Sequence, residues 1–279
     1  MRCNVCFRQC EIEEGKSGFC GVRTLKGGVI RPANYGLVTS LALDPIEKKP
    51  LARFKPGSKV LSVGSYGCNL RCPFCQNDEI SWSERAYRFA DEAEYLSPKE
   101  LADIAYGLRE KGNIGVAFTY NEPLIGYEYV RDTAKFVKEM GMDNVLVTNG
   151  CASLEVLSEL TPYIDAMNID LKGFTESYYK DVLGGDLKMV KTFISEAARV
   201  CHVEVTTLVV PGFNDSEEEI TEIASFIASL DDGEYIPLHI SRFFPQFKLT
   251  DRPATDVGLI YRLRDVASEK LKYVYTGNC

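Results

Sequence analysis

From Lys59 to its end, the sequence alternates between short apolar runs and longer segments whose apolar residues recur at helical spacing. The short runs predict strands at 59–65, 114–120, 144–149, 164–171, 202–210, 236–241 and 272–276. The longer segments predict helices at 97–111, 124–140, 153–160, 186–200, 216–230 and 255–269. Strands that alternate with helices form a parallel sheet with right-handed crossovers. The pattern therefore predicts an α/β fold, a partial (β/α)6 TIM-type barrel, over residues 57–279.

Two of these helices begin with capping signals. In Ser97-Pro98-Lys99-Glu100, an N-cap serine precedes a proline at the first helical position and a glutamate that can bond back to the cap. Ser216 and Glu219 have the same capping-box spacing. The acidic run that includes Glu219 is then a favourable first helical turn rather than a binding site.

Residues 1–56 differ from the barrel region because they contain four cysteines, several glycines and little periodicity. They predict a small cysteine-rich appendage that binds metal. Its cysteines follow a C-x2-C-x3-C-x9-C pattern and are Cys3, Cys6, Cys10 and Cys20. Four thiols are enough to close a tetrahedral site, which favours a structural role over a catalytic one. Zinc and an auxiliary iron–sulfur cluster both suit these ligands, and an appendage without metal is the third alternative.

Charge and hydropathy exclude two broad classes of function. The formal net charge is −8, and the largest basic cluster is Lys48-Lys49 beside Glu47, so binding to nucleic acid through its phosphates is not expected. No apolar run approaches the roughly 20 residues that a membrane helix needs, and no secretory signal follows Met1. Clustered cysteines without an export signal indicate metal ligands in a reducing compartment. We therefore expect a cytoplasmic protein with no nucleic-acid or membrane partner.

Three further cysteines lie in the loop after the first predicted barrel strand. Cys68, Cys72 and Cys75 follow the pattern C-x3-C-x2-C, and thiolates this close together on one loop are typical iron–sulfur ligands. Three ligands leave one iron of a four-iron cluster open, and an open position is what separates catalytic from structural zinc sites. The alternative is a zinc clip with a distant fourth ligand, although such clips usually come as paired C-x2-C knuckles.

Polar side chains gather where the predicted strands end. In chain order they are Asn121, Glu122, Thr148, Asn149, Asp170, Lys172, His239 and Ser241. Barrel active sites lie on the face formed by the carboxyl ends of the strands. The cysteine loop also follows a strand end, so we expect the cysteines and these polar groups to meet at one mouth.

Alternation along the strands separates an apolar face from a small, polar one. Ile114, Val116 and Phe118 are one apolar set, predicted to pack against the helices. The opposite, inward faces carry groups such as Asp170 and Glu204, which are costly to bury without a partner. This predicts a roomy, wet cavity for a polar ligand. The alternative is that Asp170 and its neighbour Lys172 merely pair with each other at the rim.

The cysteine spacing resembles the signature of the radical S-adenosylmethionine (radical SAM) superfamily. Within it, the chain resembles relatives of pyruvate formate-lyase activating enzyme and, more closely, the radical SAM member of the AmmeMemoRadiSam group. The matching stretches are 44–51, 68–77, 119–123, 168–172, 239–245 and 273–278.

The resemblance implies a 4Fe-4S cluster on Cys68, Cys72 and Cys75, whose open iron binds S-adenosyl-L-methionine (SAM) and cleaves it to a 5′-deoxyadenosyl radical. Glu122 matches the carboxylate that holds the SAM amino group, and Asn121 replaces a glycine of that motif. Phe74 matches the aromatic residue beside adenine. The other SAM contacts that the resemblance implies are Thr148, Asn149, Asp170, Lys172 and His239.

The same resemblance implies a reductant partner such as flavodoxin or ferredoxin. The substrate it suggests is a protein or peptide, as for the glycyl-radical-enzyme activases. No ferredoxin-like insert lies between Cys75 and the predicted helix at 97–111. A small-molecule substrate is an alternative, and a non-enzymatic iron–sulfur electron-transfer protein is a further one.

Overall fold

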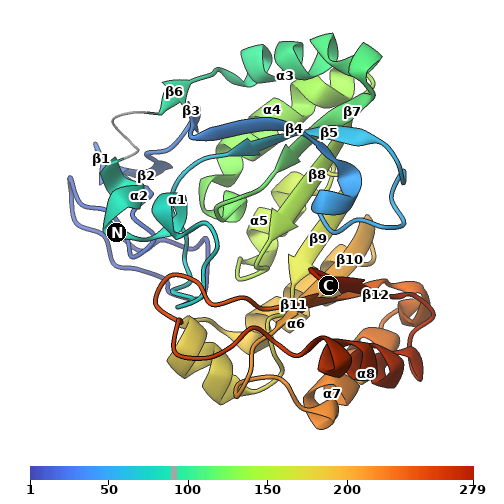
Figure 1. Cartoon of the computed structure of the whole chain (residues 1–279). Coiled ribbons are helices and arrows are strands. Elements are labelled where there is room, and N and C mark those ends of the chain that lie inside the picture. The colour runs from blue at the N-terminus through green and yellow to red at the C-terminus, as the bar shows by residue number, and fades with distance from the viewer. Residues whose placement is uncertain (89–92) are drawn as a thin grey trace.

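The computed structural model describes residues 1–88 and 93–279 and contains one large sheet (Figure 1). The strand order is β12-β11-β10-β9-β8-β7-β5-β4. In chain order these strands are β4 (Ser40–Pro45), β5 (Lys59–Gly64), β7 (Asn113–Phe118), β8 (Asp143–Thr148), β9 (Ala166–Asp170), β10 (His202–Val209), β11 (Leu238–Arg242) and β12 (Val274–Gly277). Within this sheet, the seven strands other than β4 run parallel, and β4 pairs antiparallel with β5 at the sheet edge. The predicted α/β partial barrel is confirmed.

Helices connect the parallel strands, and all six predicted ones are present with ends shifted by a few residues. They are α3 (Pro98–Gly107), α4 (Tyr127–Glu139), α5 (Leu154–Leu160), α6 (Leu187–Ala197), α7 (Glu217–Ala228) and α8 (Val257–Ser268). Shorter elements are α1 (Asp78–Ser81), α2 (Glu84–Arg88), a π-helical segment (Tyr178–Leu183) and 3-10 turns at Ile46–Lys48, Arg109–Lys111, Pro123–Gly126 and Gly233–Tyr235.

Of the two predicted capping boxes, one is complete. Ser97 accepts a hydrogen bond from the Glu100 N–H, and the Glu100 carboxylate accepts one from the Ser97 N–H. Ser216 also accepts from the Glu219 N–H at 3.1 Å. The Glu219 carboxylate, however, bonds the Phe174 N–H instead of returning to its own cap. The second box is therefore only half formed, because a tertiary contact takes its glutamate.

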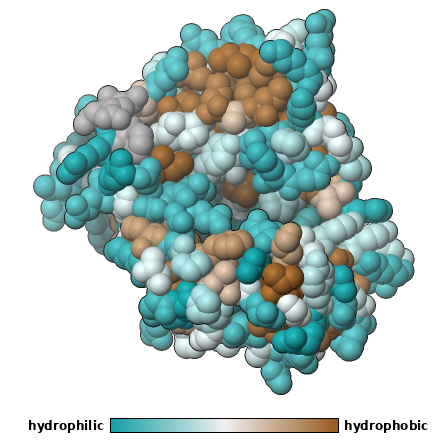
Figure 2. Space-filling model, viewed as in Figure 1, coloured by the Kyte–Doolittle hydropathy of each residue, from teal (hydrophilic) through white to brown (hydrophobic). Residues whose placement is uncertain are grey.

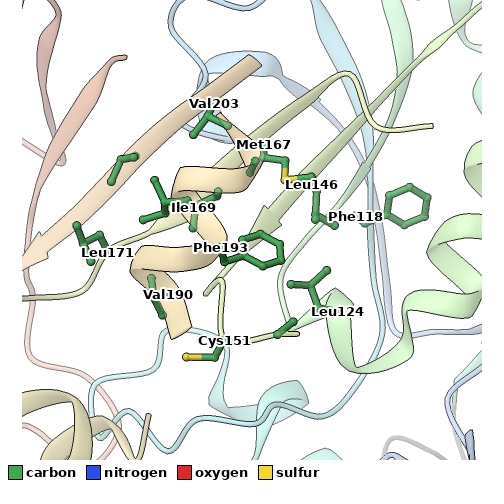
Figure 3. Close-up of a cluster of buried hydrophobic side chains, with 14 of the residues drawn as sticks. Phe118, Leu124, Leu146, Cys151, Met167, Ile169, Leu171, Val190, Phe193 and Val203 are labelled. Carbon is green, nitrogen blue, oxygen red and sulfur yellow. The ribbon is translucent and has the colours of Figure 1, made fainter. Parts of the chain in front are cut away.

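The main core lies between the sheet and its helices. Figure 3 shows Leu146 and Ile169 from neighbouring strands pointing toward Val190 and Phe193 of α6. All four side chains are fully buried. This layer is the apolar face that the strand pattern predicted.

One residue of that predicted face lies elsewhere. The pairing of β5 with β7 shifts between Lys59↔Asn113 and Leu61↔Val116, which leaves an extra residue in β7. Val116 stays in the helix-facing core, but Ile114 packs into a separate cluster on the other side of the sheet. The prediction that Ile114 faces the helices is wrong, because a bulge changes the alternation of side chains.

The separate cluster forms an apolar floor inside the barrel. It contains Ile46, Leu51, Val60, Ala117, Val145 and Ala166. The segment after β4 supplies the first two of these residues. The barrel interior is therefore not uniformly small and polar, as the sequence suggested, because the chain folds part of its own amino-terminal region into it.

The amino-terminal residues contain little regular structure. A hairpin joins β1 (Arg23–Lys26) to β2 (Val29–Pro32), and β3 (Leu37–Val38) pairs with β6 (Glu94–Tyr95). Since β4 belongs to the main sheet, the proposed appendage at 1–56 shares its last part with the barrel. The division at residue 56 stays a prediction.

The face of the molecule seen in Figure 1 is hollowed near its centre and carries an apolar patch beneath α3 (Figure 2). Leu41 of the edge strand β4 and Ile104 of α3 are exposed apolar residues. In the part of the chain that the structure describes, no helix is long and apolar enough to cross a membrane.

Candidate active site

The cysteine loop leaves the end of β5 and is held there by Asn121. The Asn121 amide oxygen accepts from the Ser65 N–H at 2.9 Å, and its NH2 group donates to the carbonyls of Tyr66 and Gly67 at 3.1 and 3.2 Å. Gly67 has φ +93°, and a Cβ there would lie 2.4 Å from the Val22 side chain. Asn121 therefore holds the loop backbone rather than standing free for a ligand.

The three thiols of this loop lie in a buried environment. Cys72 is buried, whereas Cys68 and Cys75 are half-buried. Burial raises the pKa of Cys68 well above its usual value, and the Glu122 carboxylate and the Cys72 thiol raise it further. Burial also raises the pKa of Cys72 to about 11, against the lowering effect of the Lys172 charge. In the metal-free protein, burial therefore favours the protonated thiols, and the Lys172 charge opposes this effect at Cys72.

Glu122 is the most enclosed acidic group beside this loop. Its Oε1 accepts from the Thr148 hydroxyl at 2.6 Å and from the Leu124 N–H at 3.0 Å, and its Oε2 accepts from the Asn149 N–H at 2.8 Å. Burial raises the pKa of Glu122 to about 7, although these hydrogen bonds lower it and Asp170 raises it. A carboxyl whose pKa lies near 7 can bind either a proton or a cationic ligand at neutral pH.

Asn149 joins the end of β8 to the cysteine loop. Its NH2 group donates to the Asn69 amide oxygen at 2.9 Å and to the Cys68 sulfur at 3.8 Å. Asn69 in turn donates to the Cys151 carbonyl at 2.8 Å. The sequence predicted a role for Asn149 but no partner for Asn69. The only sign in the sequence that Asn69 contributes to the site was its position directly after Cys68.

Asp170 and Lys172 follow β9 and pair with each other. Their Nζ–Oδ2 distance is 2.7 Å, and both side chains remain partly exposed. Burial lowers the pKa of Lys172, but the Asp170 and Cys72 charges outweigh it and leave this pKa well above its usual value. The pairing that the sequence offered as an alternative is present, at the edge of the cysteine site.

The family model of the radical SAM superfamily matches residues 62–227, more than half of the chain, including the cysteine loop, Glu122 and the Asp170–Lys172 pair. The chain belongs to the radical SAM superfamily. Its members use a 4Fe-4S cluster and SAM, and this chain is a radical SAM enzyme of that kind.

Two curated relatives show where in the superfamily it lies. An uncharacterized protein of Methanocaldococcus jannaschii is 42% identical over 282 residues, covering 100% of this chain and 81% of the relative. Pyruvate formate-lyase-activating enzyme of Clostridium pasteurianum is 27% identical over 212 residues, covering 76% of this chain and 84% of the relative. The chain thus resembles pyruvate formate-lyase-activating enzymes over most of its length.

Solved structures support the fold. SuiB of Streptococcus suis bound to S-adenosylmethionine matches with a TM-score of 0.60 at 15% identity, covering 79% of this chain and 52% of that chain. A domain of pyruvate-formate lyase-activating enzyme from Bacteroides vulgatus matches with a TM-score of 0.52 at 18% identity, covering 58% of this chain and 98% of that chain. This chain spans about half the length of SuiB, and at these identities the likeness shows the radical SAM fold alone.

The chemistry of the cysteine loop fits the cluster of this superfamily. Among residues 1–88 and 93–279, no three Cys, His, Asp or Glu side chains already stand in position to hold a metal ion. The donor set is nevertheless three thiols on one loop, and the Cys68 sulfur already accepts N–H bonds from Leu70 and Asn149 at 3.4 and 3.8 Å. Hydrogen bonds to sulfur are characteristic of iron–sulfur sites. When bound, the reduced cluster supplies the electron that cleaves SAM to the 5′-deoxyadenosyl radical.

His239 lies beside a buried carboxylate in the barrel. Its Nε2 is 2.6 Å from Glu204, which also contacts His202 at 2.9 Å and accepts from the backbone N–H groups of Ala52 and Arg53 at 2.9 and 2.7 Å. Burial raises the pKa of Glu204, but these hydrogen bonds lower it to about 2. The expectation that this buried carboxylate requires a bound ligand is wrong, because the chain itself supplies its partners.

Phe74 is buried and packs edge-on against Phe243, with ring centroids 6.2 Å apart. The loop that carries Phe243 also contacts the cysteine loop through the backbone, since the Lys248 N–H donates to the Pro73 carbonyl at 2.9 Å. The sequence did not predict this contact between the cysteine loop and the loop that joins β11 to α8.

The four amino-terminal cysteines line one pocket, which they share with Asn69 of the cysteine loop. Burial raises the pKa of Cys6 to about 11, and the nearby Cys20 and Cys3 thiols raise it further. The predicted grouping of Cys3, Cys6, Cys10 and Cys20 is thus present in space, whereas metal binding by these residues stays a prediction.

Proposed function

We propose that this radical SAM enzyme abstracts hydrogen from a protein or peptide, as the glycyl-radical-enzyme activases do. The observation that carries the proposal is its similarity to pyruvate formate-lyase-activating enzyme over 76% of the chain. We further propose that it belongs to the radical SAM branch of the AmmeMemoRadiSam group, and the sequence stretches it shares with that branch support the proposal.

In this proposal, Cys68, Cys72 and Cys75 hold the 4Fe-4S cluster, and the Glu122 carboxylate receives the amino group of SAM. A cation beside Glu122 would favour its charged form, which burial alone disfavours. Asn121 acts as a positioning residue through the loop backbone. The remaining SAM contacts are proposed at Phe74, Thr148, Asn149, Asp170, Lys172 and His239.

The first test measures SAM cleavage in anaerobically reconstituted protein. After reduction with dithionite, we expect wild type to release 5′-deoxyadenosine, detected by mass spectrometry. The triple variant Cys68→Ala, Cys72→Ala, Cys75→Ala should release none, and Cys201→Ser, a change outside the cysteine loop, should behave as wild type. Absence of product from wild type whose reduced cluster gives its electron paramagnetic resonance (EPR) signal would refute the enzymatic function and favour electron transfer.

The second test identifies the substrate class. A lysate of the source organism grown in deuterated medium is separated by ultrafiltration into macromolecules and small molecules. Deuterium in the released 5′-deoxyadenosine is then measured with each fraction. Transfer from the retained macromolecules alone supports a protein or peptide substrate. Transfer from the filtrate, or from neither fraction, contradicts it.

A small-molecule substrate is the second candidate. Two segments already pack on the cysteine loop, since Arg71 of the loop donates to the Phe19 carbonyl at 2.6 Å and the Lys248 N–H bonds Pro73. These contacts narrow the approach for a large substrate.

We also propose two features that accompany this chemistry. The cluster receives its electron from a flavodoxin or ferredoxin in the cytoplasm, where its thiols stay reduced. In addition, Cys3, Cys6, Cys10 and Cys20 bind a second metal, for which zinc and an auxiliary iron–sulfur cluster are the chemical alternatives.

A further inference from the structure

The amino-terminal cysteines form a pocket of unusual composition. Its walls include Cys3, Cys6, Cys10 and Cys20, and all four thiols are free of disulfide bonds in the described chain. Residues 1–22 form no helix or extended strand there, only isolated bridges. Val5 and Ile12 anchor this segment in the main core, and a metal bound by its four thiols would fix the rest of its backbone.

Two of the sulfurs already accept backbone hydrogen bonds. The Phe19 N–H donates to the Cys10 sulfur at 3.4 Å, and the Arg23 N–H donates to the Cys20 sulfur at 3.5 Å. A Cβ on Gly18 would lie 3.4 Å from the Cys10 sulfur, so the backbone approaches this ligand closely. The same N–H groups would bond the sulfurs of metal-bound thiolates and orient them.

An arginine in the same pocket wall has one buried N–H donor without a hydrogen-bond partner among the described residues. Arg23 lines the pocket and is only 6% exposed. Its Nη1 pairs with both Glu128 oxygens at 2.7 Å, but its Nε has no hydrogen-bond partner among the described residues. A buried, unpartnered donor on a cation is costly. Four thiolates around a divalent ion carry a net negative charge, and such a centre would offset that cost.

The spacing of the ligands favours zinc over an auxiliary cluster. Cys3-x2-Cys6-x3-Cys10 has the C-x2–4-C spacing that is typical of structural zinc sites. The fourth thiol, Cys20, lines the same pocket and completes a set of four. We infer that Cys3, Cys6, Cys10 and Cys20 bind a single zinc ion in a closed tetrahedral site.

The zinc site would support the cluster-binding loop through the side chains of Arg8 and Phe19. Arg8, between the second and third zinc ligands, donates to the Asn69 carbonyl at 2.9 Å and to the Gly184 carbonyl at 2.5 Å. Phe19 precedes the fourth ligand, and the guanidinium carbons of Arg8 and Arg71 lie 3.3 and 3.9 Å from the centroid of its ring. Both zinc-binding segments thus present a side chain to residues of the Cys68–Cys75 loop. This second role rests on the proposed function of that loop.

The first experiment counts metals per chain in full-length protein purified anaerobically. Wild type, the Cys68/Cys72/Cys75 triple alanine variant and the Cys201→Ser control should each keep about one zinc. The double variant Cys6→Ser, Cys20→Ser should keep none. Wild type in which cobalt replaces zinc should show thiolate-to-cobalt charge-transfer absorption. Because zinc is counted in the triple variant, this result does not depend on SAM cleavage.

Two outcomes would overturn the zinc assignment. One is zinc-free wild type and triple variant. The other is iron and sulfide retained by the triple variant, which would establish an auxiliary cluster instead. If the double serine variant does not fold, native mass spectrometry of the wild type and the triple variant still counts the bound metal.

The second experiment tests the support of the loop with variants that leave the zinc ligands intact. Arg8→Ala should retain zinc but lose amide-exchange protection over residues 68–75. It should also lose its 4Fe-4S cluster to a chelator about tenfold faster, as expected for a lost hydrogen bond from a charged group. Lys16→Ala, on the exposed part of the same segment, is the matched control. Equal protection and equal cluster loss in Arg8→Ala and wild type would refute the supporting role and leave the zinc count unaffected.

Discussion

Burial of Glu122 should make the metal-free protein less stable as pH rises. The pKa of this carboxyl rises from 4.5 to about 7 on folding, chiefly because burial removes it from water. A difference of that size corresponds to about 3 kcal/mol of free energy of unfolding. The folded chain binds this proton more tightly than the unfolded chain does. The contribution is therefore full below pH 4.5 and is lost progressively as pH rises through 7.

Glu122→Gln removes the ionisation and keeps most of the shape. The amide oxygen can still accept from Thr148 and Leu124, but its NH2 group then faces the Asn149 N–H, which costs about 1–3 kcal/mol for an unpaired donor. That cost does not change with pH. The free energy of unfolding of the variant, relative to that of wild type, should therefore rise by about 2.5 kcal/mol between pH 5 and pH 8.

Urea unfolding of metal-free, reduced protein at several pH values measures this shift. Glu217→Gln, which alters an exposed glutamate in the first turn of α7, is the control, and its gap from wild type should be the same at pH 5 and pH 8. If the gap between Glu122→Gln and wild type is the same at pH 5 and pH 8, Glu122 does not titrate near 7 and the reasoning fails. With the cluster reconstituted, Glu122→Gln should also bind SAM more weakly, as judged by calorimetry.

Three further outcomes follow from the same structure. Gly67→Ala should cost more than the roughly 1–2 kcal/mol expected of the control Gly57→Ala. Both glycines have positive φ, but only at Gly67 would the new Cβ meet side chains within 4 Å, those of Val22 and Ile125; equal losses in urea unfolding would contradict this. Glu204→Gln should remove roughly 3 kcal/mol that wild type has above pH 4.5 and loses as pH falls toward 2, so a gap that stays constant in acid unfolding would refute it. Asn121→Ala should cost about 1–3 kcal/mol and speed amide exchange in residues 65–68, and unchanged exchange there would count against its role.

The sequence was informative where local patterns determine structure. Apolar spacing predicted the helices and strands, and the parallel sheet that these imply brings separate strand ends to one edge. For that reason Glu122, Thr148 and Asn149 were expected near the cysteine loop, and hydrogen bonds join them there.

Such local patterns could not predict contacts between residues that lie far apart in the sequence. The β7 bulge reverses Ile114 because the strand pairing, not the apolar spacing, determines the register. Glu204 appeared to need a ligand because its backbone partners at Ala52 and Arg53 lie about 150 residues earlier in the sequence. The contact of Phe19 with Arg71 likewise joins segments that no local pattern connects.

The cysteine loop has no strand partner, so its backbone carbonyls must be satisfied by other means. Asn121 bonds Tyr66 and Gly67, Arg8 bonds Asn69, and the Lys248 N–H bonds Pro73. These contacts come from three separate regions of the chain, and in each of them it is the loop backbone that is bonded. Removing one of them should change how firmly the loop holds a cluster without changing its ligands. Iron stoichiometry therefore reports on the cysteines, whereas the rate of iron loss reports on the residues that hold the loop.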